Sequence, residues 1–391
     1  MSNLLNYTNP QVEIGEYVQV FVGPDKTPST TLGSGQYLLP GTYNQSDYPE
    51  LFNRIGFQEG AAYTPRISGT TSAIYSLTYG NGVYLYGTSG GGLSSSTDGI
   101  TWTTRANPSG SSDVNALIYA NGLYVYAGAS GILGTSTNGT SFTSRTSGTF
   151  SVINALTYGN GLYVYGGAGG ALATSTNATT WTARTAVSTS IILSLTYGNG
   201  LYVYAGAGGA VATSTDGTTW IGRVSNTTSS IMAVVYGNGV YVYAGFGGIV
   251  ATSTDAITWT TRTSGTTTSI FALTYANGLY IYAAGNGGIV ATSTDAITWT
   301  TRSIGSITAA HVQYALAYGN GFYLLGGYTS SVTPSSGLLY TSTTGVTIEY
   351  STTYNLSTQF VVPSVAIPGA ITGTAIAGYS IPQNTYYIKA K

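Results

Sequence analysis

Residues 270–302 read IFALTYANGLYIYAAGNGGIVATSTDAITWTTR and contain four short apolar runs, separated by Asn-Gly, by a glycine-rich stretch and by Thr-Asp-Ala. No run is long enough for an ordinary helix, and Val, Ile, Thr, Tyr and Trp suit pleated, half-buried strands. Asn-Gly between alternating apolar residues is a strong hairpin signal, because both central residues of a type I′ turn need a positive φ. We therefore expect antiparallel strands at 271–275 and 279–283, followed by strands at 288–293 and 298–302.

This unit is repeated along most of the chain. The motif Tyr-(Gly/Ala)-Asn-Gly-(Leu/Val/Phe)-Tyr occurs seven times, in steps of 39 or 40 residues and a final step of 43. Its asparagines are Asn81, Asn121, Asn160, Asn199, Asn238, Asn277 and Asn320. A period of about 40 residues indicates stacked supersecondary units, and four antiparallel strands per repeat form the blade of a β-propeller. A linear β-solenoid is the alternative architecture.

A second marker predicts how the blades close into a ring. Every repeat ends in an arginine, and the seven are Arg66, Arg105, Arg145, Arg184, Arg223, Arg262 and Arg302. The first arginine precedes the first complete repeat, whereas the last repeat, at 314–343, lacks a well-formed fourth strand. We therefore predict that residues 63–66 pair with the third strand of the last blade, around 338–342. The expected fold class is all-β, a seven-bladed β-propeller of four-stranded antiparallel blades at residues 61–351, whose closure removes exposed sheet edges.

Composition excludes several classes of function. Only 6% of the residues are charged and the formal net charge is −1, whereas nucleic-acid binding needs clustered Lys and Arg. The chain has no Cys, so disulfides and thiolate metal sites are excluded, and we expect neither a metal nor a cofactor. No apolar run approaches a membrane-spanning length and residues 1–7 do not read as a signal peptide, so no membrane insertion is expected.

The turn before the fourth strand carries a motif of its own. Ser96-Thr-Asp-Gly-Ile-Thr-Trp102 recurs with small changes in six repeats and resembles a shortened Asp-box of bacterial neuraminidase-like repeats. In that family the box is a structural turn far from the active site. The acid or amide can accept hydrogen bonds from its own downstream backbone, and the aromatic residue can pack between blades. The residues at the two positions are Asp98, Asn138, Asn177, Asp216, Asp255 and Asp295, and Trp102, Phe142, Trp181, Trp220, Trp259 and Trp299.

The Asp-box resemblance makes a neuraminidase-like glycoside hydrolase one alternative function. Glycosidases generally need two carboxylates, and the propeller acids outside the boxes are Asp113 and Glu349. Ring closure makes their blades neighbours, but no further set of Arg or Glu accompanies them. We therefore expect a protein that is not an enzyme, assign no catalytic residue, and interpret the periodic arginines as parts of the blades.

Tyrosines at i and i+2 occupy the second strand of six repeats, as Tyr202 and Tyr204 do, and so face one side of each sheet. We interpret them as an aromatic layer between blades in which each hydroxyl reaches a polar partner. Stacking against sugar rings is the alternative.

The two ends of the chain resemble another family. Residues 35–56, GQYLLPGTYNQSDYPELFNRIG, are similar to the opening of the phage tail-fibre collar domain, and residues 357–364, STQFVVPS, are similar to its continuation. The resemblance implies one collar-like docking domain, built from residues 1–60 and 352–391, with the propeller inserted between its halves. It implies a virion tail protein of a tailed bacteriophage, assembled in the host cytoplasm and later extracellular, whose partners are tail or baseplate proteins and a host surface glycan or receptor. A purely structural virion decoration is a further alternative.

The last repeat departs from the pattern of the others and suggests a binding site. Its connections at 306–314 and 327–337 are longer than their counterparts, and loops on rigid scaffolds often carry function. We expect a receptor pocket surrounded by Tyr328, His311, Gln313, Tyr314 and, from the first blade, Asp113, with Tyr328 stacking on a sugar. A neutral insertion is the alternative.

Overall fold

The computed structural model divides the chain into two units, Met1–Gly60 with Ile348–Lys391, and Ala61–Thr347. It describes residues 64–285, 288–302, 311–329 and 336–342, together with short strands at 17–18, 37–38, 41–44, 359–362 and 387–389. None of the helices found among these residues is both long and apolar enough for a membrane span.

Both chain ends contribute strands to the first unit. Its strands are β1 (Tyr17–Val18), β2 (Tyr37–Leu38), β3 (Gly41–Asn44), β32 (Gln359–Val362) and β33 (Tyr387–Lys389). Strand β33 pairs with β1 and β2, and β3 pairs with β32. The collar-like identity of this unit stays a prediction.

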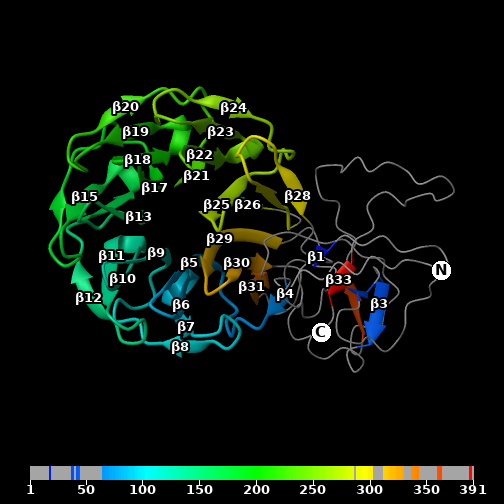
Figure 1. The fold of residues 1–391 in the computed structure, drawn as a ribbon. Helices are drawn as coiled ribbons and strands as arrows, with labels where there is room; N and C mark the ends of the chain where they lie inside the picture. Colours follow the sequence, from blue (N-terminus) through cyan, green and yellow to red (C-terminus); the bar gives the residue numbers. More distant parts are fainter. Residues whose placement is uncertain are drawn as a thin grey trace, which may run out of the picture. The chain divides into compact units, whose positions relative to one another are not determined.

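The second unit consists of seven four-stranded antiparallel sheets arranged as a ring, which confirms the seven-bladed propeller and excludes the solenoid (Figure 1). The first strands are β5 (Ile74–Gly80), β9 (Val114–Ala120), β13 (Ile153–Gly159), β17 (Ile192–Gly198), β21 (Ile231–Gly237), β25 (Ile270–Ala276) and β29 (His311–Gly319). The second strands are β6 (Val83–Thr88), β10 (Leu123–Gly128), β14 (Leu162–Gly167), β18 (Leu201–Gly206), β22 (Val240–Gly245), β26 (Leu279–Ala284) and β30 (Phe322–Thr329).

The outer strands of the blades are shorter. The third strands are β7 (Leu93–Ser96), β11 (Ile132–Ser136), β15 (Leu172–Ser175), β19 (Val211–Ser214), β23 (Val250–Ser253), β27 (Val290–Ser293) and β31 (Ser336–Ser342). The fourth strands are β8 (Thr103–Arg105), β12 (Thr143–Thr146), β16 (Thr182–Ala183), β20 (Ile221–Arg223), β24 (Thr260–Arg262), β28 (Thr300–Arg302) and β4 (Thr64–Arg66). Short 3-10 turns join second and third strands at η1 (Ser89–Gly91), η2 (Ala129–Gly131), η3 (Ala168–Gly170), η4 (Ala207–Gly209) and η5 (Phe246–Gly248).

Each Asn-Gly turn joins the first and second strands of its blade, as predicted. The seven asparagines have φ between 42° and 49°, and the glycines after them have φ between 76° and 82°, which are the values that a type I′ turn requires. In the repeat quoted first, β25 and β26 match the expected hairpin. Strand β27 begins two residues later than expected. Strand β28 also begins two residues later, because residues 294–298 form a turn around the Asp295 side chain.

The ring is closed by a strand from the start of the propeller. In β4, Arg66 pairs with Leu339 and Thr64 with Thr341 of β31, so the predicted closure is confirmed, and Figure 1 shows the two strands side by side. The Arg66 Nε donates to Thr341 Oγ1 at 2.7 Å. The same bond to the third strand is made by Arg105, Arg145, Arg184, Arg223, Arg262 and Arg302. The closing blade therefore follows the rule of the others despite its split sequence.

The predicted aromatic layer lies between the blades. The first tyrosine of each second strand is buried and its hydroxyl donates to a main-chain carbonyl of the preceding blade. These bonds join Tyr84 to Gly319, Tyr124 to Gly80, Tyr163 to Ala120, Tyr202 to Gly159, Tyr241 to Gly198, Tyr280 to Gly237 and Tyr323 to Ala276. Because they are buried, these tyrosines do not offer their faces to a sugar.

The residues of the Asp-box-like motif build turns. Asp255 Oδ1 accepts from the backbone N–H groups of Ile257 and Thr258, both at 2.8 Å. The same pair of bonds is made by Asp98, Asn138, Asn177, Asp216 and Asp295. Trp259 packs on Tyr243 at 4.8 Å between ring centroids and belongs to a core cluster shared with Val203 of the preceding blade. The boxes therefore stabilise the turn and the joint between blades.

Candidate ligand-binding site

A β-bulge interrupts the pairing of the first and second strands in every blade. In the sixth blade Ile270 pairs with Ala284 and Ala272 pairs with Ala283, so Phe271 between them has no partner. The register shifts in the same way in the other six blades. The seven unpaired residues are Tyr75, Asn115, Asn154, Leu193, Met232, Phe271 and Tyr314, and we call them the bulge residues. A bulge re-aims its side chain, and all seven line one cavity.

This cavity has a volume of about 410 Å³ and is lined only by first strands, one from every blade. It therefore lies on the axis of the ring, and we call it the axial pocket. A pocket of this size falls within the range of small-molecule sites, roughly 300–1,000 Å³. Each first strand begins just before its bulge. The pocket is therefore on the face of the propeller where second strands connect to third strands.

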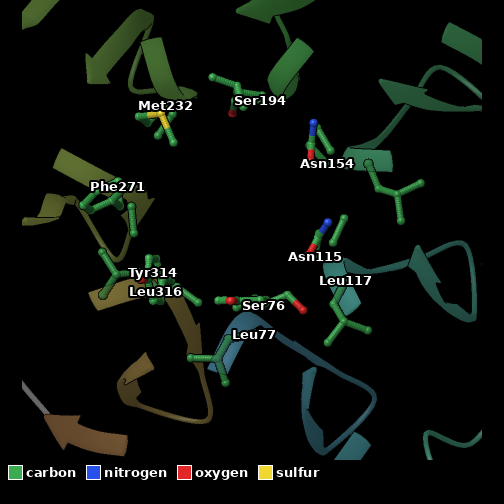
Figure 2. Close-up of a pocket in the computed structure, with 18 of the residues that line it drawn as sticks. Ser76, Leu77, Asn115, Leu117, Asn154, Ser194, Met232, Phe271, Tyr314 and Leu316 are labelled. Carbon is green, nitrogen blue, oxygen red and sulfur yellow. The ribbon is translucent and has the colours of Figure 1, made fainter. Parts of the chain in front are cut away.

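The wall of the axial pocket has two chemically different sides. Figure 2 shows Asn115 and Asn154 on one side, and Met232, Phe271 and Tyr314 on the other. The ring of Tyr314 meets Tyr75 edge-on at 5.2 Å and Phe271 at 5.6 Å between centroids. We call Tyr75, Tyr314 and Phe271 the aromatic arc, and Asn115 and Asn154 the amide pair.

Hydrogen bonds between neighbouring first strands hold the wall in place. Ser76 Oγ donates to the carbonyl of Val114 at 2.9 Å, and Asn154 Nδ2 donates to the carbonyl of Ile192 at 3.1 Å. Across the described residues no such bond ties the side-chain amide of Asn115. Asn115 is half-buried and can offer both a donor and an acceptor to a bound molecule.

The axial pocket is uncharged. Its lining contains no Asp, Glu, His, Lys or Arg. Burial, followed by the nearby Asp113 carboxylate and Tyr328, raises the pKa of Tyr75 above its ordinary value. Burial, with Tyr75 and Tyr328, also raises the pKa of Tyr314. Both phenols are therefore neutral hydrogen-bonding groups at neutral pH, and the wall suits binding better than acid–base chemistry. The described residues hold no cluster of side chains able to bind a metal ion.

The structure brings three of the five predicted site residues to this face. Tyr314 lines the axial pocket. Tyr328 lies close enough to Tyr75 and Tyr314 to affect the pKa of both. Asp113 Oδ1 accepts from the N–H of Gly90 at 2.8 Å, beside Tyr75. Tyr314 and Tyr328 belong to the seventh blade and Tyr75 to the first. Asp113 directly precedes β9 of the second blade, so its expected place in the first blade is corrected.

The other two predicted residues have different outcomes. Gln313 is fully buried and does not line the pocket, so the expectation that it contacts a ligand is corrected. The reason is its register: Gln313 pairs with Gly327 just before the bulge, at the strand position that Ile270 fills as a core residue. His311 pairs with Thr329 at the start of β29, and its side chain is outside the described residues, as is Glu349.

Most bulge residues cannot be recognised in the sequence, because they fit the ordinary alternation of side chains along a strand. A signal was nevertheless present. In six copies the residue before the bulge is Ile or Val, and in all seven the residue after it is Ala or Ser, whereas the bulge residue itself is Tyr, Asn, Leu, Met or Phe. A position that takes polar, aliphatic and aromatic residues between two regular neighbours marks a side chain that packing does not determine.

Comparison with known proteins shows the fold alone. No protein family and no curated protein matches the chain. A structure of YCF48 bound to a D1 peptide is similar with a TM-score of 0.60 and 16% identity, over 73% of this chain and 98% of that one. A catalytically inactive virginiamycin B lyase from Staphylococcus aureus with quinupristin has a TM-score of 0.64 and 12% identity, over 72% and 98%. YCF48 from Cyanidioschyzon merolae has a TM-score of 0.57 and 16% identity, over 72% and 98%.

Proposed function

We propose that this chain is a virion tail protein of a bacteriophage, whose propeller binds a host surface glycan or receptor. The observation that carries the proposal is the axial pocket, where an aromatic arc faces an amide pair in a wall without charge. Aromatic faces and neutral hydrogen-bonding groups are the usual means of holding an uncharged ligand. The pocket therefore favours adhesion over a purely structural decoration.

The positions of the acidic residues favour binding of a ligand over its hydrolysis. The Asp-box carboxylates lie in turns between third and fourth strands, on the face opposite the axial pocket. Of the acids in the described residues, this leaves Asp113 near the pocket, already bonded to Gly90. A glycosidase needs two carboxylates that flank one bond, so we propose that the protein is not an enzyme.

The terminal unit supports the second half of the proposal, docking to the virion. Strands from both chain ends pair with one another there, as an interrupted collar-like domain requires. We propose tail or baseplate proteins as its partners, with no role for nucleic acid or membrane insertion, and a place in the virion tail after assembly in the host cytoplasm.

Two measurements test this function. Mass spectrometry and antibody labelling of purified virions should find the chain on the tail. The purified full-length chain, added in excess, should slow adsorption of those virions to host cells. Absence of the chain from virions, or unchanged adsorption in its presence, would contradict the proposal.

A further inference from the structure

The propeller fold does not determine which residue type occupies the bulge position of each blade. Each bulge residue lies at the same place in the same bulge, and its side chain is half-buried around the axial pocket. Blades of almost identical sequence accept Asn154, Leu193 or Phe271 there. The identity of these residues is therefore not determined by packing between blades.

The first ligand property that the axial pocket distinguishes is charge. A carboxylate moved from water into a site without a cation loses hydration that nothing replaces. The lining of the axial pocket offers no Lys, Arg or His, and the carboxylate of Asp113 beside Tyr75 adds repulsion. An acidic sugar is disfavoured for both reasons, and a neutral one is not.

The second property is the pairing of an amide with an apolar surface. A primary amide such as that of Asn115 can donate to the carbonyl and accept from the N–H of a second amide. Across the pocket, Phe271 and Tyr314 offer rings on which the apolar face of a sugar can stack. A sugar with an acetamido group combines those features, since it carries an amide beside the apolar face of its ring.

We infer that the ligand of the axial pocket is a neutral sugar that carries an acetamido group. Its ring lies against the aromatic arc, and its acetamido group meets the amide pair. This inference rests on the proposed function and narrows it from a host glycan to one class of sugar residue.

Calorimetric titration of the full-length chain tests the inference. The probes are N-acetylglucosamine and N-acetylgalactosamine, their parents glucose and galactose, and the acidic sugar glucuronic acid. We expect each acetamido sugar to bind about tenfold more tightly than its parent, and glucuronic acid not to bind. Equal affinity for an acetamido sugar and its parent, tighter binding of glucuronic acid, or no binding by any probe would overturn it.

Swaps between blades provide matched variants, because each installs a residue that another blade already holds at the same bulge. Asn115→Leu copies Leu193 and should abolish the tenfold preference for an acetamido sugar over its parent. Phe271→Asn copies Asn154 and should weaken binding of every sugar. Phe150→Ala is the control, since Phe150 is 95% exposed on a connecting loop, and it should change nothing. Thermal melting of each variant checks the fold, and retention of the preference by a folded Asn115→Leu variant would refute the inference.

Adsorption to host cells separates this inference from the proposed function. If both swaps weaken the ability of the chain to compete with virions but no acetamido preference is measured, the sugar class is wrong and the adhesion function stands. If neither swap affects competition, the axial pocket is not the adhesion site and both proposals fall.

Discussion

At the residue scale, the propeller depends on side chains that repeat one bond in every blade. Asp255 and Asn138 are interchangeable in the box turn, because either Oδ1 accepts the same two backbone N–H groups. The first tyrosine of each second strand has no such substitute, since its hydroxyl reaches a carbonyl of the neighbouring blade. Local turns therefore tolerate a change of charge, whereas the joints between blades depend on one functional group.

The carboxylates of the box turns make the stability of the fold depend on pH. Hydrogen bonds from the backbone N–H groups of Thr258 and Thr298 lower the pKa of Asp255 and Asp295 from 3.8 to about 2. A lowered folded pKa gives stability that is complete above 3.8 and is lost as the pH falls towards 2. The double variant Asp255→Asn/Asp295→Asn should change unfolding free energy at neutral pH by less than about 0.5 kcal/mol. Its melting temperature should fall less than that of the wild type between about pH 5 and about pH 2; an equal or larger fall would contradict the assignment.

The joint between the third and fourth blades is tested by Tyr202→Phe. The substitution removes the donor to the carbonyl of Gly159 and leaves a buried acceptor without its partner. We expect a loss of about 1–3 kcal/mol in unfolding free energy, measured by chemical denaturation. A loss indistinguishable from zero would mean that water or a neighbouring group replaces the hydroxyl.

At the scale of the element, one displaced strand and seven bulges account for the shape of the site. Strand β4 completes the last blade from the other end of the propeller sequence. The bulges turn one residue of each first strand towards the axis while the residue before it stays in the core, as Ile270 does before Phe271. The pocket is thus assembled from seven equivalent irregularities in the sheets.

Removal of β4 should open the ring. A chain of residues 61–347 retains the strand, whereas a chain of residues 67–347 leaves the edge of β31 unpaired. We expect the shorter chain to aggregate, because an exposed strand edge pairs with other chains. Size-exclusion chromatography with light scattering distinguishes the two, and a monomeric, cooperatively folded 67–347 chain would show that closure by β4 is dispensable.

At the scale of the whole propeller, the seven hydrogen bonds from tyrosine hydroxyls link every blade to its neighbour and form a complete circuit around the ring. Tyr84 of the first blade donates to Gly319 of the last, in the same way that each other blade bonds to the one before it. The circuit holds the first strands around the axial pocket. It also brings Tyr328 of the last blade close enough to Tyr75 of the first to raise the pKa of the Tyr75 phenol.

Adsorption to host cells tests whether the junction of the first and last blades contributes to binding. Replacement of Tyr328 and His311 by Ala should make the purified chain about tenfold weaker in competing with virions for host cells. This is the effect of losing one stacking contact of about 1.4 kcal/mol. The melting temperature should change little, because both residues flank the extended connections of the last blade. Unchanged adsorption would place the binding site away from this seam.

The sequence by itself determined the architecture of the propeller, because its decisive signals are local or periodic. Asn277-Gly278 demands positive φ whatever surrounds it, and the arginine of each fourth strand falls out of phase with the Asn-Gly turns, which predicted the pairing of Arg66 with the last blade. Tertiary structure alone decided which side chains reach the axis. A bulge exists only in the pairing of two strands, so Phe271 and Asn115 could not be separated from their neighbours by counting along one. For the same reason Gln313, one residue before a bulge, is buried while Tyr314 lines the pocket.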